Sequence, residues 1–381
     1  MEAGENVLSS GGFKRLKGYF RIVDIGPHFL VIQSVVDFRT DLTALVHLLM
    51  PLFLQVFQED SIMSGYRHPR SSATDCVLSL FQMTNETLNI WTHFLPTWYF
   101  LWKLLSVVLL YSAWRDSYTW PLLIYLISIC LYPLASTCAH TFSSMSARAR
   151  HIGFFWDYGA LSFYSLGSAV AYSHYAFPDR WIDSPFHRYF LPIAMGNSIL
   201  CTGLACSSRF PESPRPRFSN ALRMLAFAYP YLFDSIPLFY RVFLCTGEGC
   251  TNSSTNVLHV YHIGLAFLTG FLFDYIGHSH QLFHVCAILG SHTQMQALEE
   301  DMRMRRPWLL EKFPPVTFSS SVGPALLCLL ISVSIICLFS LPLLWAPAGP
   351  GSGAPRTRRA TPREASLENT ERSSQAPKSS L

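Results

Sequence analysis

The sequence predicts an all-α polytopic membrane protein. Of its 381 residues, 50% are hydrophobic and only 14% are charged, whereas soluble proteins carry about 25% charged residues. The chain therefore has too little charge to cover a soluble surface of this size. Several long stretches have almost no charged residues, and in lipid only helices and closed barrels satisfy their backbone groups. These stretches lack the strict alternation of barrel strands, so we expect helices.

Eight segments are candidate transmembrane helices, because each approaches the ~20 apolar residues that a bilayer requires. They lie at about 88–112, 118–141, 153–175, 189–208, 222–243, 257–273, 275–295 and 322–345. An earlier apolar run, 42–57, is shorter and contains Pro51. This favours an interfacial helix over a further span.

Basic residues in the short loops predict the orientation of the chain. Arg148 and Arg150 lie between the second and third spans, and Arg209 lies between the fourth and fifth, so both loops are expected in the cytoplasm. This orientation places the connection 245–256 outside the cell. That connection is flanked by two cysteines and holds a glycosylation sequon at Asn252, and both features suit an extracellular position.

The same orientation divides the chain into three parts. Residues 1–84 form a cytoplasmic N-terminal segment with the possible interfacial helix 42–57, and residues 85–345 form the transmembrane helical bundle. Residues 346–381 are rich in Pro, Gly, Ser and Arg. Such a segment cannot bury enough apolar surface to fold, so it is predicted to be a disordered basic tail.

Five polar residues are predicted to lie near the cytoplasmic ends of three spans. Ser136 and His140 are four residues apart in the second span, and His280 and His284 have the same spacing in the seventh. Each pair therefore shares one helical face. Asp157 lies early in the third span, where a charged group facing lipid would cost ~2.5–3.5 kcal/mol or more. It is expected to face the bundle.

Three imidazoles at one depth predict a metal site. Three neutral histidines form a recurring zinc arrangement, and an Asp or Ser nearby can hold a water or orient a ligand. The alternative is that each is a hydrogen-bonded core histidine, which is the usual role of a lone histidine on an apolar helix. His278 points away from His280 and His284, and we interpret it as such a structural residue.

Two further polar features have structural interpretations. Asn85, Asn89 and His93 follow one another at four-residue spacing, with Glu86 beside the first. We interpret this set as a helix cap and a hydrogen-bonded seam between helices. Charged residues also occur inside the first and fifth spans and could form a buried ion pair or face a ligand; they are Lys103 and Asp234.

At these residues the sequence resembles the progestin and adipoQ receptor (PAQR) family, in particular the gamma type of its membrane progestin receptor branch. The segments that carry the resemblance are FQMTNETLNIWTHFLPTWYF, ASTCAHTFSSMSARARHIGFFWDYGALSFYSLGSA, AFAYPYLFDSIPLFYR and FDYIGHSHQLFHVC. The resemblance implies a seven-helix bundle with a cytoplasmic N-terminus and an additional eighth transmembrane helix. It also implies a Zn2+ ion on His140, His280 and His284, with Asp157 and Ser136 beside the metal-bound water.

The resemblance implies two functions of different classes. The first is a plasma-membrane receptor that binds progesterone-like steroids and signals through G proteins, with membrane lipid around it and no nucleic-acid partner. The alternative, implied by related branches, is a zinc-dependent ceramidase-like amide hydrolase, in which Asp157 and Ser136 would be catalytic. A protein whose zinc is purely structural is a third reading.

One departure from the family pattern concerns spans six and seven. FLTGFLF joins DYIGHSHQ directly, where the family has a polar, basic connection. A continuous helix from 257 to 298 would be ~60 Å long, twice the hydrocarbon thickness. The alternatives are one fused span, which leaves the basic segment 299–315 in the cytoplasm, or a tight reversal near Asp274. We expect the reversal, because only then do the histidines of span seven reach His140.

Overall fold

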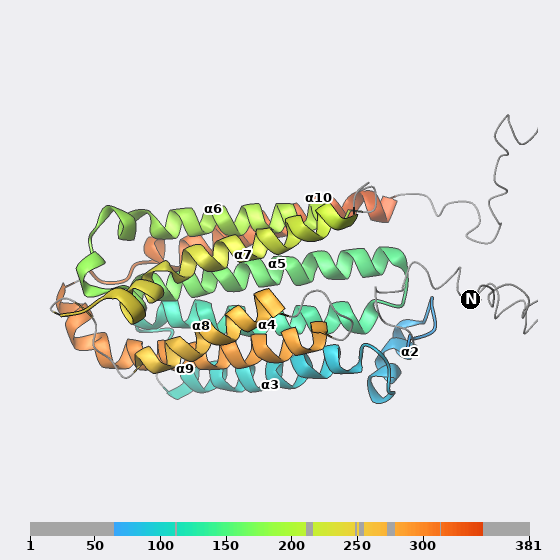
Figure 1. Ribbon diagram of the computed structural model, residues 1–381, viewed down its shortest axis with the longest axis horizontal. Coiled ribbons are helices and arrows are strands. Elements are labelled where there is room, and N and C mark those ends of the chain that lie inside the picture. Colours follow the sequence, from blue (N-terminus) through green and yellow to red (C-terminus); the bar gives the residue numbers. More distant parts are fainter. Residues whose placement is uncertain are drawn as a thin grey trace, which may run out of the picture.

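The structure is a computed structural model that describes residues 65–110, 113–210, 216–247, 250, 255–272, 279–312 and 314–345. The predicted interfacial helix 42–57 and the predicted tail 346–381 lie outside these residues. Every element in the described part of the chain is helical, as the fold class predicts. Long helices lie side by side along one common direction, which gives the elongated bundle in Figure 1.

Eight long helices form the bundle in the described residues. They are α3 (Thr87–Leu110), α4 (Trp120–Phe142), α5 (Ala147–Ala171), α6 (Pro185–Ser208), α7 (Pro216–Phe239), α8 (Thr255–Leu272), α9 (Ser279–Lys312) and α10 (Val322–Trp345). Each overlaps one predicted span, and α10 lies against α5 and α6 (Figure 1). The predicted eighth helix therefore packs on the bundle.

Length and composition alone mark four of the described helices as able to cross a membrane: α3, α4 with the turn before it, α6 and α10. The other long helices are shorter or more polar. Their polar residues are largely turned into the bundle, where Asp234 of α7, His262 of α8 and Gln294 of α9 are all buried. The exposed surface is apolar instead, with Trp98 on α3 and Leu330 on α10 as examples.

Local sequence explains where several helices begin and where they approach closely. Ser146 and Ser184 cap α5 and α6 by accepting hydrogen bonds from the backbone N–H groups of Ala149 and His187, which are donors that a helix start leaves unpaired. Close approach depends on small residues. A Cβ atom at Gly159 of α5 would lie 2.4 Å from a side-chain carbon of Ile336. The glycine therefore allows α10 to pack closely against α5.

The chain reverses direction between α8 and α9, as predicted. The His262 imidazole Nδ1 lies 3.0 Å from the carbonyl oxygen of Gly290, and His259 Nε2 lies 2.9 Å from Asp301 Oδ2. From the first contact to the second, the residue number falls along α8 and rises along α9. The two helices are therefore antiparallel. The residues of the reversal itself, including Asp274, lie outside the described residues.

Helix α9 is longer than the predicted span 275–295. Its 34 residues correspond to about 51 Å, and its second half carries ion pairs to four other parts of the chain. These pairs join Glu299 to Lys103 (3.0 Å), Asp301 to Arg241 (2.7 Å), Arg305 to Asp179 (2.5 Å) and Arg306 to Asp116 (2.7 Å). These ion pairs stabilise the charged residues of α9 beyond residue 295, so the helix extends past the predicted span.

The suggested ion pair between Lys103 and Asp234 is wrong. Lys103 pairs with Glu299, because α3 packs beside α9. Asp234 accepts a hydrogen bond from the Ser165 hydroxyl at 2.5 Å, because α7 packs beside α5. Sequence depth alone could not identify which neighbours these helices have.

Candidate metal centre

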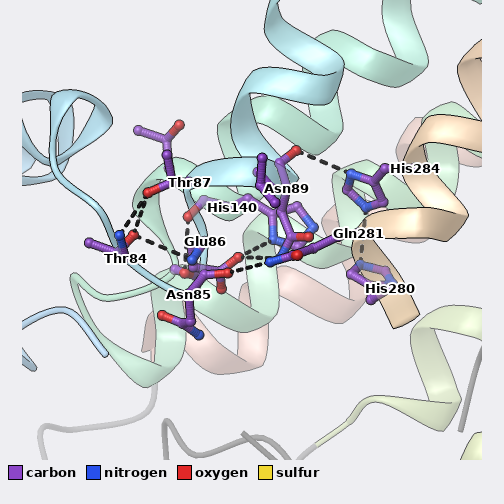
Figure 2. Close-up of polar contacts among 12 residues, drawn as sticks. Thr84, Asn85, Glu86, Thr87, Asn89, His140, His280, Gln281 and His284 are labelled. Atoms are coloured by element: carbon purple, nitrogen blue, oxygen red, sulfur yellow. Dashed lines mark hydrogen bonds and ion pairs between the residues drawn. The ribbon is translucent and has the colours of Figure 1, made fainter. Parts of the chain in front are cut away.

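Three histidines from two helices meet at one end of the bundle. His140 lies in the last turn of α4, and His280 and His284 lie in the first two turns of α9. One ring nitrogen from each lies within 4.8 Å of the others, and Figure 2 shows the three rings together. His140 and His284 are buried, and His280 is partly buried. The structure thus brings together the three residues that the sequence predicted as metal ligands.

Hydrogen bonds fix the ring orientation of two of these histidines. His140 Nδ1 lies 2.8 Å from Glu86 Oε2, and His284 Nδ1 lies 3.1 Å from the backbone oxygen of Asn89. Both partners are acceptors, so each Nδ1 carries the proton and each Nε2 keeps a lone pair. His284 Nε2 lies 3.1 Å from His280 Nε2. Two such nitrogens at this distance are stabilised by a proton between them or by a cation that both bind.

The carboxylate behind His140 comes from the start of α3. Glu86 precedes the helix and is buried, and the Asn89 amide donates to its Oε2 at 2.8 Å. Burial alone would raise the pKa of Glu86, but His140 and the hydrogen bonds, with help from Arg67, lower that pKa to about 2. Glu86 is therefore held as an anion. A carboxylate that accepts from the outer nitrogen of a histidine is the usual second layer of a zinc site.

Arg67 holds the helix end that carries His140. Its guanidinium donates to the backbone oxygens of His140 and Thr141, at 2.5 Å each, and to the Ser143 hydroxyl at 2.8 Å. These carbonyls belong to the last turn of α4, where helix geometry leaves them unpaired and the helix dipole favours a cation. Residues 65–84, predicted only as part of a cytoplasmic segment, thus pack on the bundle beside the site. The short helix α2 (Ala73–Leu78) lies here (Figure 1).

Asp157 and Ser136 lie beside the histidines rather than among them. The Asp157 carboxylate lies close to Ser136 and interacts electrostatically with His140. Asp157 is not part of the described group whose atoms lie within 4.8 Å of one another. It lies on α5, which packs beside α4. His278 lies outside the described residues.

His93 of α3 is the site residue that the sequence interpretation missed. Its ring stacks on His284, with centroids 3.9 Å apart and planes inclined by 6°. Two parallel rings at this separation cannot both direct an in-plane lone pair at one ion about 2 Å away, so His93 forms a wall of the site and is no fourth ligand. Its four-residue spacing from Asn89 could have indicated that His93 faces the site, but we interpreted this set as a seam between helices.

Several buried polar atoms around the three histidines have no hydrogen-bond partner among the described residues. They are both ring nitrogens of His93, the Asn89 Oδ1 atom and the Thr137 hydroxyl. Unpaired buried polar atoms cost ~1–3 kcal/mol each, and they commonly mark positions where a ligand or ion binds. With three imidazoles and a supporting carboxylate, the donor set fits a divalent zinc ion.

The sequence matches the family model described as haemolysin-III related over residues 81–295. This range includes all three histidines and Glu86. Among curated proteins, the chain is 60% identical to membrane progestin receptor gamma-B of Danio rerio over 320 aligned positions, and the match covers 77% of this chain and 92% of that protein.

Human proteins show the same similarity. The chain is 52% identical to human membrane progestin receptor gamma over 306 residues, covering 77% of this chain and 92% of that protein. It is 53% identical to human membrane progestin receptor delta over 309 residues, covering 77% and 90% respectively.

Proposed function

Because the chain belongs to the haemolysin-III related family, we propose that it is a plasma-membrane receptor that binds a progesterone-like steroid and signals through a G protein. The observation that carries the proposal is the 60% identity to a membrane progestin receptor over 92% of that protein's length. The described bundle supports it, because its long apolar helices expose side chains such as Trp98 and Leu330, and a hydrophobic ligand would reach such a protein through the lipid.

The proposed receptor holds Zn2+ on His140, His280 and His284. Zn2+ supplies Lewis acidity and a fixed positive charge where it binds. Glu86 keeps the proton of His140 on Nδ1, and the Asn89 carbonyl does the same for His284, so both rings present Nε2. Arg67 fixes the end of α4 from which His140 projects. These contacts orient the rings before any ion binds.

In the proposed orientation the N-terminus and the three histidines lie on the cytoplasmic side. Helices α4 to α7 alternate in direction, so the end of α4 and the end of α7 lie on opposite sides. The end of α7 leads to a disulfide between Cys245 and Cys250. Disulfides persist in oxidising compartments, which supports an extracellular position for that connection.

A second candidate function is zinc-dependent hydrolysis of a ceramide-like amide. The observation that favours it is the pair formed by Asp157 and Ser136 beside His140. A carboxylate in this position could accept a proton during hydrolysis. Steroid binding makes no such demand on Asp157.

The experiment that separates the two functions uses the purified full chain in lipid nanodiscs. We expect saturable binding of a tritiated progestin and no fatty-acid release from ceramide, and D157N should change steroid binding less than about threefold. Ceramide hydrolysis that D157N abolishes would establish the enzyme. Absence of saturable steroid binding would contradict the receptor. Stimulation of guanine-nucleotide exchange by the same progestin in membranes tests the G-protein step.

A further inference from the structure

A second buried polar group lies away from the three histidines, in the middle part of α7. Asp234 is 4% exposed and is flanked in the same helix by Pro230 and Pro237. An acidic side chain inside a membrane bundle is costly and is usually retained for a function. Its partners therefore need to be identified.

Only one of the two carboxyl oxygens of Asp234 has a partner. The Ser165 hydroxyl donates to Oδ2 at 2.5 Å. Oδ1 is buried and has no hydrogen-bond partner among the described residues. The cation that the sequence suggested for it, Lys103, pairs with Glu299 instead. In the described part of the chain, no Lys, Arg or His forms an ion pair with Asp234.

Several neighbouring interior polar groups are paired with one another, whereas Asp234 and the Tyr231 hydroxyl on the same helix each keep a buried polar atom without a partner among the described residues. Tyr132 and Ser291 hydroxyls lie 2.9 Å apart, the Tyr125 hydroxyl donates to Gln294 at 3.0 Å, and Tyr172 contacts His262 at 3.3 Å. Tyr164 of α5 also donates to Gln294, at 2.5 Å, so this network joins α4, α5, α8 and α9. Asp234 lies at the edge of this network, because it interacts electrostatically with Tyr172, and its hydrogen bond with Ser165 places it between α5 and α7.

The chemistry of an unpaired buried carboxyl group determines which ligand it can take. A buried carboxylate without a cation loses its hydration and gains nothing in return, so these surroundings favour the protonated carboxyl. Ser165 donates to Oδ2, which leaves the proton on Oδ1. A neutral carboxylic acid in an apolar site is a hydrogen-bond donor for a ketone oxygen. The missing partner is therefore an acceptor, and no described protein group supplies it.

We propose that Asp234 is a ligand-binding residue whose Oδ1–H donates a hydrogen bond to a carbonyl oxygen of a lipid-soluble ligand. The ligand class is a steroid ketone, and in this respect the inference rests on the proposed function. The amide carbonyl of a ceramide has the same acceptor chemistry, so the experiment includes both ligands. The site is distinct from the three histidines, because none of its contacts involves them.

The test measures binding to the wild type, D234A and D234N in nanodiscs, with D116N as the matched control. Asp116 is a partly exposed acid that forms an ion pair with Arg306. D234A removes the donor and should weaken binding of a diketone progestin about tenfold or more. D234N keeps an amide donor and the acceptor for Ser165, so its affinity should stay within about threefold of the wild type, as should that of D116N.

Two analogues, each lacking one of the two steroid carbonyls, identify the bonded oxygen. For the analogue that lacks the carbonyl bonded to Asp234, D234A should change the affinity less than about threefold, and for the other analogue the tenfold loss should persist. An equal loss for both analogues means a structural role and overturns the inference. So does unchanged progestin binding by a folded D234A protein.

Two further arms cover the remaining outcomes. Infrared difference spectra of the wild type, which require no variant to fold, should show the carboxyl band of Asp234 shifting when ligand binds; the absence of any shift contradicts the inference. If the wild type binds short-chain ceramide but no progestin, the receptor proposal fails, and a tenfold loss of ceramide binding in D234A would still support the carbonyl site. If neither ligand binds, both proposals fail.

Discussion

Glu86 illustrates at the residue scale how one carboxylate can organise the candidate metal centre. It is buried at the start of α3, accepts from the Asn89 amide, and lies 2.8 Å from His140 Nδ1. Helix α3 supplies no predicted ligand, but it orients rings on both α4 and α9. The residues that orient the histidines, Glu86 and Asn89, are therefore as much a part of the site as the histidines themselves.

The first prediction concerns this carboxylate. E86A should lower zinc affinity 10- to 100-fold, because loss of an outer-layer partner frees the ring and lowers its basicity. A metal-competition titration of the purified protein measures this change. The matched control is E300Q, which removes a partly exposed acid paired with the exposed Arg303 and should leave affinity unchanged. Equal zinc affinity in E86A and the wild type would contradict the role of Glu86.

At the scale of elements, the second half of α9 joins several helices and loops at the end of the bundle opposite the three histidines. Segment 299–312 contains four basic and four acidic residues, so its net charge is close to zero. Three of its basic residues form ion pairs with acids: Arg303 with Glu300, Arg305 with Asp179 and Arg306 with Asp116. Arg241 and Asp301 form the centre of these pairs, and both are fully buried.

The second prediction is that D301N destabilises the fold by ~3–5 kcal/mol, because it leaves the buried Arg241 charge without its partner. The melting temperature in micelles should fall by about 5 °C or more. E300Q is again the control, since an exposed pair contributes ~0–1 kcal/mol. Similar melting temperatures for both variants would show that the buried pair does not stabilise this end.

The same pair predicts a pH dependence of stability. Burial alone would raise the pKa of Asp301, but the charge of Arg241 and the hydrogen bond with His259 lower the pKa below its usual range. A depressed carboxyl pKa contributes stability above the unfolded value of about 3.9 and loses it as pH falls below that value. The wild-type melting temperature should therefore fall more steeply below about pH 4 than that of D301N.

The third prediction tests the direction of α9. P315N places an N-x-T sequence at the exposed connection between α9 and α10, with Val316 and Thr317 completing it. If α8 and α9 form two separate passes, this connection faces the same side as Asn252 and becomes glycosylated in microsomes. If Asn252 is glycosylated and the asparagine of P315N is not, the connection after α9 lies on the other side of the membrane, and α8 and α9 are not two separate passes.

At the scale of the whole molecule, the histidine cluster joins helices that are far apart in the sequence. His140 of α4 and His284 of α9 meet only because α9 returns beside α3 and α4. An ion that binds the folded arrangement stabilises it by ~2.7 kcal/mol at a concentration one hundred times its dissociation constant. A bound ion is thus expected to stabilise the packing of α9 against α4.

The fourth prediction follows from this connection. Chelation should lower the melting temperature of the wild type by several degrees, and H284A should lose most bound zinc and no longer respond to chelator. H292A is the matched control, because His292 lies on the same helix and contacts Tyr99 instead. Stoichiometric zinc in H284A, measured by elemental analysis, would remove His284 from the ligand set.

The sequence by itself determined the membrane class, the helical elements, the family and the histidines that meet. Charge-poor stretches of bilayer length predicted the long helices, and the i, i+4 spacing of His280 and His284 predicted their shared face. Motif resemblance to the PAQR family agrees with the matches to membrane progestin receptors. These properties depend on composition and local periodicity, which a single chain displays directly.

Only the tertiary structure decided which partner each polar residue has. Glu86 and His93 looked like parts of a helix seam until α4 and α9 were placed beside them, and Lys103 looked like a partner of Asp234 until α9 supplied Glu299. The reason is physical: helical periodicity fixes the face on which a side chain lies, but the energy of a buried polar group depends on the neighbouring helix. That neighbour comes from a distant part of the chain.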